Sequence, residues 1–370
     1  MLAVRLDRNL HHSDARARPK VLLFSVVYPP LREGYCLVVS AQLLLPVAPC
    51  PYPLRSAHMF PLSFNPAQPE ITDLIVQHDP ATLERLPVNK NQILDTFATF
   101  RNHQALAAVR AIPARDAVLD PQAVDRLMLT VHWEMQRLAE EFFHGQRIYE
   151  LLKVVLNALQ ANGIERPIRV VDVGCGIGYA IRWLAARTPL ASQGVELVGV
   201  DLNATLIREA TRLAAAEDLP CRFLHGDAFS AQHAGHVYLS TGVLHHFRGH
   251  AFHYLLRRHD LPATAAFLHY DFRPWVLAPL GSWFFHILRM RTAIARHDGV
   301  LSTARAYTGE MLATSSRNAL EDFSSGIYGA NIWGTPLPRV FHTLLGMRRR
   351  LLPAFRAGLG VRAIRLGEMV

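Results

Sequence analysis

The chain has 370 residues, of which 50% are hydrophobic and 19% are charged, so it can bury a sizeable core as one large domain or two small ones. Its formal net charge is +9, but the first 58 residues carry seven basic and three acidic residues, and residues 337–370 carry seven arginines and one glutamate. The part between these flanks is nearly neutral, which argues against a nucleic-acid-binding surface there.

The four cysteines are scattered along the chain. Cys36, Cys50, Cys175 and Cys221 form no CxxC pair, so the sequence predicts neither a disulfide framework nor a zinc knuckle. This usage is typical of a reducing compartment, and we expect a cytoplasmic protein.

The first 58 residues contain two short apolar runs separated by Pro29 and Pro30. Neither run approaches the roughly 20 residues that a membrane span needs. We therefore expect a poorly ordered N-terminal extension over 1–58 and no transmembrane segment; a membrane-contacting segment is the alternative.

Apolar residues recur at helical spacing between Pro80 and about Ala161, as at Leu127, Val131 and Leu138. The pattern predicts helices with a break at Gly145. Their aromatic and methionine side chains are assigned to packing. We expect residues 59–160 to form a helical cap or lid.

From residue 168 onward, apolar strands alternate with helices. The predicted strands are Ile168–Val173, Val195–Val200, Arg222–Leu224, Val237–Ser240 and Ala265–Tyr270, and the helices between the first three are Ala180–Ala186 and Ala204–Glu217. Such alternation predicts an α/β fold with a doubly wound, mostly parallel sheet that binds ligands at the carboxyl ends of its strands.

The first predicted strand runs into three glycines in "VVDVGCGIGYA". Gly174, Gly176 and Gly178 form GxGxG, and Tyr179 stands where a dinucleotide fingerprint has its third glycine, so a dinucleotide is disfavoured. Asp201 ends the next strand, where a carboxylate accepts hydrogen bonds from ribose hydroxyls. Together, at the ends of adjacent strands, these features make a purely structural role for the glycine turn and the acid unlikely.

Four stretches, "VVDVGCGIGYAIRWLA", "LVGVDLNATLIREA", "CRFLHGDAF" and "VYLSTGVLHHF", resemble in order and spacing the motifs of the class I S-adenosylmethionine-dependent methyltransferases over about residues 168–275. The resemblance implies a seven-stranded Rossmann-like methyltransferase sheet over 161–346, followed by a basic tail over 347–370, and S-adenosylmethionine as cofactor. The cofactor contacts that it implies are Asp172, Gly174, Cys175, Gly176, Gly178, Asp201, Leu202, Asp227, Ala228 and Thr241.

The same resemblance assigns roles to some of these residues. Asp172 and the glycines would surround the methionine part of the cofactor, and Asp201 would bind its ribose. Asp227 would accept from the exocyclic amine of adenine, with Leu202 stacked on that base.

Three histidines are candidate catalytic residues, since a hydroxyl acceptor needs a base to remove its proton. His245 and His246 follow the fourth predicted strand, and His269 lies near the end of the fifth, two residues before Asp271. A capping or packing role for these histidines is the alternative. The family resemblance also places Tyr307 and Thr308 at the border of the acceptor site.

We predict no metal site. His246, His250 and His253 have helical spacing, but no glutamate completes HExxH and the neighbourhood contains arginines, so a solvated helix face is favoured.

The last part of the sheet is the least regular in sequence. "WGTPLPRVFHTLLG" resembles the entry to the last antiparallel strand of the family, whereas "SSRNALEDFSSGIYGANI" predicts a loop-rich segment where relatives keep a helix.

Three function classes follow. The first is a methyltransferase that modifies a small, apolar or aromatic metabolite at oxygen or carbon. The second is a methyltransferase of RNA or protein that uses the arginine-rich tail; "STGVLHHF" lacks the Asn/Asp–Pro–Pro–aromatic motif of amino-methylating enzymes, which counts against nucleic-acid bases. The third is a non-catalytic binding module, disfavoured by the intact glycine loop and acids. The oligomeric state is left open.

Overall fold

The structure is a computed structural model that describes residues 65–79, 82–329, 340–367 and 369. The extension predicted over residues 1–58 lies outside these residues. Within the described part of the chain, no helix is long and apolar enough to cross a bilayer.

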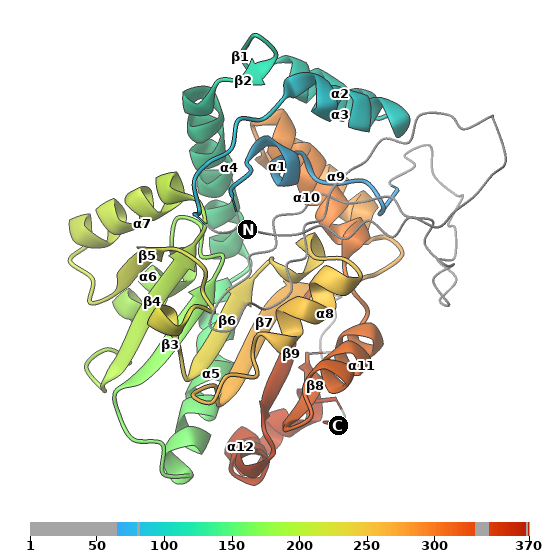
Figure 1. The fold of residues 1–370 in the computed structure, drawn as a ribbon. Coiled ribbons are helices and arrows are strands. Elements are labelled where there is room, and N and C mark those ends of the chain that lie inside the picture. Colours follow the sequence, from blue (N-terminus) through green and yellow to red (C-terminus); the bar gives the residue numbers. More distant parts are fainter. Residues whose placement is uncertain (1–64, 80–81, 330–339, 368, 370) are drawn as a thin grey trace, which may run out of the picture.

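A seven-stranded sheet with the order β5-β4-β3-β6-β7-β9-β8 forms the centre of the molecule (Figure 1). Its five parallel strands are β3 (Ile168–Val173), β4 (Val195–Asp201), β5 (Arg222–His225), β6 (Val237–Thr241) and β7 (Ala266–Phe272). The last two strands are β8 (Phe323–Tyr328) and β9 (Phe341–Arg348), and β9 runs antiparallel to both of its neighbours. The strand order reverses between β3 and β6, where ligands bind in such sheets. The predicted fold class is confirmed.

Helices cover both faces of the sheet, which explains why its strands are continuously apolar. Val170 and Leu197 belong to the core on one face and Val171 and Val198 to the core on the other. The first face is covered by α5 (His144–Ala161), α6 (Tyr179–Arg187), α7 (Ala204–Ala216) and α12 (Leu352–Leu359). The second is covered by α8 (His250–Arg257) and α11 (Gly309–Ala319).

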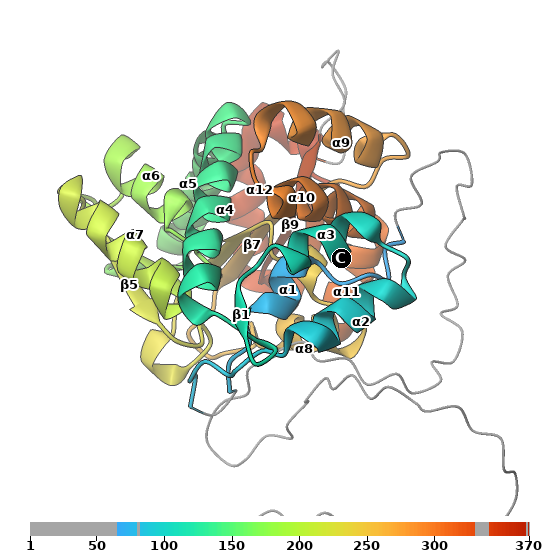
Figure 2. The ribbon, with the colours of Figure 1, turned by 90° about the horizontal axis from the view of Figure 1, so that it is seen from above.

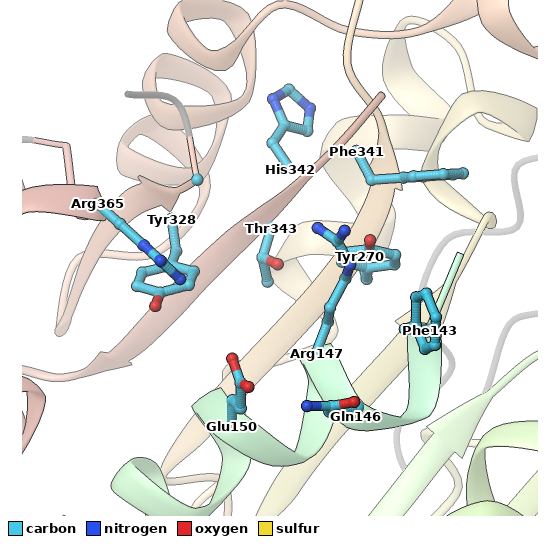
Figure 3. A pocket seen from close by; sticks show the side chains of 11 residues that line it. Phe143, Gln146, Arg147, Glu150, Tyr270, Tyr328, Phe341, His342, Thr343 and Arg365 are labelled. Carbon is cyan, nitrogen blue, oxygen red and sulfur yellow. The ribbon is translucent and has the colours of Figure 1, made fainter. Parts of the chain in front are cut away.

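A helical cap with its own apolar core lies beyond the carboxyl ends of the parallel strands (Figure 1). Its elements are α1 (Ile71–Ile75), α2 (Lys90–Thr99), α3 (His103–Arg110), the short strands β1 (Ala114–Arg115) and β2 (Val118–Leu119), α4 (Pro121–Glu141) and α10 (Ala293–Arg305). Seen from above, α1 lies near the centre, between α3, α4 and α10 (Figure 2). Because α10 follows the fifth parallel strand, the cap combines two distant parts of the chain.

The expected helix break at Gly145 is wrong by two residues. α4 ends before Phe143, which has a φ of 55°, and Gly145 lies buried in the first turn of α5. A Cβ added to Gly145 would lie 2.2 Å from Cδ2 of Trp183. The glycine therefore allows α5 and α6 to pack closely instead of ending a helix.

The expectation of a loop-rich segment over "SSRNALEDFSSGIYGANI" is also wrong. Helix α11 continues to Ala319, and strand β8 follows it. A hydrophobic pattern does not indicate this strand, because it contains small polar residues. One of them, Ser325, is buried, and its Oγ lies 2.7 Å from Oγ of Ser316.

The domain divisions predicted from sequence differ from the packing. α5 lies before the 160/161 boundary, yet it packs on the sheet. The proposed tail begins inside β9, and Phe355 and Leu359 of α12 are buried in the same core as α5.

Candidate functional site

The loop that follows β3 has the backbone that its glycines predict. Gly174, Gly176 and Gly178 have φ values of 67°, 56° and 79°, a region that side chains rarely adopt. A Cβ at Gly178 would lie 2.3 Å from Cε1 of Phe223. Gly178 thus supplies the close contact between the loop and the sheet, and Tyr179 begins α6.

Asp201 holds this loop from the end of β4. Its Oδ2 accepts a hydrogen bond of 2.9 Å from the Gly176 N–H, and its Oδ1 accepts one of 2.8 Å from the Asn203 N–H. The side chain keeps partial exposure, so the carboxylate is fixed in position at the sheet edge while still open to a ligand.

A cavity of about 150 Å³ opens beside the loop. It is lined by five of the predicted cofactor residues: Gly174, Asp201, Leu202, Asp227 and Ala228. The sequence reasoning missed other residues that line it, among them Phe229, Val243, Phe247, Tyr254 and Arg258. The predicted ribose and adenine contacts therefore share one concave site, at the point where the strand order reverses.

The remaining predicted cofactor residues lie around this cavity. Thr241 ends β6, and Cys175 lies under the loop, where its Sγ approaches Gly199. Asp172 is buried in β3, and its Oδ1 has no hydrogen-bond partner among the residues that the structure describes. Burial, with a smaller effect of Asp201, raises the pKa of Asp172 well above its usual range. A buried acceptor without a donor suits the ammonium group of an amino-acid ligand, so the residues present fit the methionine end of S-adenosylmethionine.

Arg258 restrains the acid at the other end of the cavity. Asp227 Oδ2 accepts a hydrogen bond of 2.7 Å from Arg258 Nη2, and its Oδ1 accepts one of 3.0 Å from the Phe229 N–H. The guanidinium also lies over the Phe229 ring, 5.3 Å from its centroid. Sequence reasoning saw Arg258 only as local positive charge, because the pairing brings together residues 31 positions apart.

Two of the three candidate catalytic histidines lie side by side in the 3₁₀ helix η2 (Leu244–His246) that follows β6. His245 Nδ1 lies 2.7 Å from Asp271 Oδ1, and the backbone N–H of His245 donates to Asp271 Oδ2 at 3.1 Å. His246 Nδ1 lies 2.7 Å from Oδ1 of Asp73, which belongs to α1 of the cap. Each ring is therefore oriented by a carboxylate.

A buried ionic cluster joins the cap to these histidines. Arg305 of α10 places its Nη1 2.8 Å from Asp73 Oδ2 and 3.3 Å from Glu70 Oε1, and its Nη2 donates to the His246 carbonyl at 3.3 Å. Burial disfavours a charged His246 ring, but Glu70 and Asp73 outweigh this effect and raise its pKa to about 9. This shift favours the imidazolium form of His246 near neutral pH.

The ligand atoms of Glu70, His245 and His246 lie within 4.8 Å of one another, as metal ligands do. Arg305 and the protonated His246 already supply positive charge to the carboxylates of Glu70 and Asp73. The group is therefore an ion-pair cluster. The other members of the histidine pattern seen in the sequence, His250 and His253, lie in α8 outside this group.

The structure does not bring His269 to the same place. Its Nδ1 lies 2.8 Å from Ser240 Oγ and its Nε2 lies 3.0 Å from His259 Nε2, within the core beneath α8. Burial, together with His259, lowers the pKa of His269 well below its ordinary value. Tyr307 is likewise engaged, because its hydroxyl donates to the Phe247 carbonyl at 2.7 Å.

Residues 170–259 match the family model described as a methyltransferase domain. Over 89 residues the chain is 34% identical to the ribosomal RNA small subunit methyltransferase C of Alcanivorax borkumensis, a match that covers 24% of this chain and 25% of that one. The chain thus matches about a quarter of the length of this curated relative.

Solved methyltransferase structures are also similar. The plantazolicin methyltransferase BpumL in complex with SAH gives a TM-score of 0.40 at 16% identity, covering 62% of this chain and 98% of that one. Magnesium protoporphyrin IX methyltransferase from Synechocystis PCC 6803, with bound SAH, gives 0.34 at 16% identity, covering 70% and 100%.

The family match spans the loop of three glycines, Asp201 and Asp227, which the fold gathers around one cavity at the reversal of the strand order. Residues 170–259 therefore form a methyltransferase domain, and the residues around the cavity fit S-adenosylmethionine as its cofactor.

Proposed function

We propose that the protein transfers the methyl group of S-adenosylmethionine to an oxygen or carbon of a small, apolar or aromatic metabolite. The observation that carries this proposal is the position of α1 over the end of β6. Glu70 and Asp73 from the cap contact His246 directly, so the cap covers the strand ends where the acceptor has to approach.

S-adenosylmethionine, when bound, supplies a methyl group on a sulfonium cation that is ready for in-line displacement. The chain's own contribution is to hold and orient. Asp201 is fixed by two backbone N–H groups, and Asp172 offers an unpaired oxygen next to the loop. Correct placement of two reactants alone lowers a barrier by several kcal/mol, about 7–11 in favourable cases.

His246 is better suited to binding an anionic oxygen than to removing a proton. A base must be neutral before it accepts a proton, and a pKa of about 9 leaves the ring charged at neutral pH. We therefore propose that the His246 cation positions the acceptor. The general-base role that the sequence suggested for His245 and His246 stays a prediction, and the core position of His269 gives no support to its catalytic role.

The pH dependence of transfer separates these two roles. A positioning cation predicts that kcat/KM falls as the pH rises through about 9, whereas a base predicts a rise over the same interval. His246→Gln should abolish the dependence and slow transfer by roughly a hundredfold while cofactor affinity stays unchanged. An unchanged profile in this variant would contradict both roles.

A macromolecular acceptor is the second candidate, because the curated relative is by its name a ribosomal RNA methyltransferase. The arginines near the end of the chain give this candidate limited support, since Arg348 is already bound by Asp260, Asp322 and the Leu261 carbonyl.

Incubation of a metabolite extract and of total RNA and protein with cofactor labelled in the methyl group tests the acceptor class. Label in an extractable small molecule supports the first proposal. Label only in RNA or protein would replace it with the second. Asp201→Ala is the control: label that it still transfers does not depend on the cofactor site.

A further inference from the structure

Helix α9 (Ala278–Arg289) turns its apolar side toward solvent. Leu280, Phe284, Ile287 and Leu288 are exposed, with 62% of Phe284 and 66% of Leu288 accessible. Their i, i+4, i+7 and i+8 spacing places them on one stripe of the helix. Figure 2 shows α9 on the periphery of the molecule, beside α10.

The inward side of α9 carries Phe285, which packs on the cap core and on Phe142, together with the polar residues Ser282 and His286. Ser282 Oγ donates to the Gly299 carbonyl at 2.9 Å, and the buried His286 ring rests on Gly299, where an added Cβ would lie 2.0 Å from its Nε2. A surface helix normally buries its apolar stripe and exposes its polar one. α9 instead leaves Leu280, Phe284, Ile287 and Leu288 exposed.

The residues before α9 extend this surface. Trp275, Val276 and Leu277 are exposed, and 76% of Val276 is accessible. We call the whole surface the α9 patch: Trp275, Val276, Leu277, Leu280, Phe284, Ile287 and Leu288. Contiguous exposed apolar surface on a soluble domain marks an interaction site.

Positive charge borders the α9 patch. The sequence has no acidic residue between Asp271 and Asp298, but it has arginines at 273, 289, 291 and 296. Arg289 pairs with Glu141 of α4. Arg291, which follows α9, is exposed, and its backbone N–H donates to the buried Glu134 at 2.9 Å.

We propose that the α9 patch docks on the surface of an anionic lipid bilayer. An apolar stripe with Trp, Phe and Leu, in a segment that contains arginines and no acidic residue, is the composition of helices that lie in the membrane interface. The helix would lie parallel to the bilayer, with Phe284 and Leu288 in the acyl boundary and Arg291 near lipid phosphates. This inference does not depend on the identity of the methyl acceptor.

Co-sedimentation of the full chain with vesicles of phosphatidylcholine alone, or with one-third phosphatidylglycerol, tests the proposal. Binding to the anionic vesicles should weaken with salt. The double variant Phe284→Glu/Leu288→Glu should weaken binding at least tenfold. The matched control is Val361→Glu/Ile364→Glu, which places the same charges on two apolar residues that are 93% and 63% exposed elsewhere. Vesicles should also shift the tryptophan emission to shorter wavelength, and Trp275→Phe should reduce that shift.

Equal binding by both double variants, or no binding to anionic vesicles at low salt, would overturn the proposal. Light scattering that shows a dimer in the wild type and a monomer only in Phe284→Glu/Leu288→Glu would assign the α9 patch to self-association instead. Because the substituted residues are exposed, the melting temperatures of both variants should stay close to that of the wild type.

Discussion

Asp73→Asn should loosen the cap from the sheet. The carboxylate of Asp73 contacts both His246 and Arg305, and the variant keeps the shape of the side chain while removing its charge. Raising the pKa of His246 from 6.5 to about 9 corresponds to ~3 kcal/mol at 1.36 kcal/mol for each unit. Because Glu70 shares this interaction and 32% of the His246 side chain is exposed, we expect a loss of about 2 kcal/mol in the free energy of unfolding.

The same cluster sets a pH dependence of stability. The folded pKa of His246 lies above its unfolded value, so the folded state binds the extra proton. Its contribution is complete below about pH 6.5 and is lost as the pH rises through about 9. The wild type should therefore become less stable over this interval, and Asp73→Asn should show a flatter curve.

Urea unfolding followed by circular dichroism, repeated between pH 6.5 and 9.5, measures both effects. Asp116→Asn is the matched control, because Asp116 is 94% exposed and its contact with Arg115 should contribute almost nothing. Equal stability of Asp73→Asn and the wild type at pH 7, or a flat wild-type curve, would refute the reasoning.

Other predictions concern the loop, the core and the N-terminus. Gly178→Ala should destabilise by roughly 1–3 kcal/mol in urea unfolding, because its φ is 79° and the new Cβ would meet Phe223, whereas Gly281→Ala, which meets nothing within 4 Å, should not. Burial lowers the pKa of His259 to about 4 in the folded state, so the unfolded chain binds the proton more readily. The free energy of unfolding should therefore fall as the pH drops from about 6.5 toward 4, and His259→Gln should reduce this acid sensitivity. Deletion of residues 1–58 should leave solubility and melting temperature almost unchanged; aggregation of the shortened protein in light scattering would contradict the extension hypothesis.

The parallel sheet and the cofactor loop could be predicted from sequence because local patterns encode them. The predicted first strand, Ile168–Val173, is the observed β3, and the glycines have the positive φ that their residue type allows. β8 was missed because its pattern, "FSSGIY", contains three small residues in the middle of a buried strand.

The ion-pair cluster could not be predicted, since its members are distant in sequence. Glu70 and Asp73 form the capping box of a helix of five residues, which by itself signals only a helix start. Arg305 lies 232 positions from Asp73, and nothing local indicates their contact. The raised pKa of His246 could not be predicted for the same reason, because it depends on residues that only the fold brings near the ring.

Isothermal titration of S-adenosylmethionine and its demethylated product into the wild type and Asp201→Ala tests the central claim, that the cavity beside the glycine loop holds this cofactor. Charge-assisted hydrogen bonds contribute about 1.5–3 kcal/mol, so Asp201→Ala should bind each compound at least tenfold more weakly while its melting temperature stays close to that of the wild type. Absence of heat with either compound in the wild type, equally good binding of NAD, or unchanged affinity in Asp201→Ala would contradict the account.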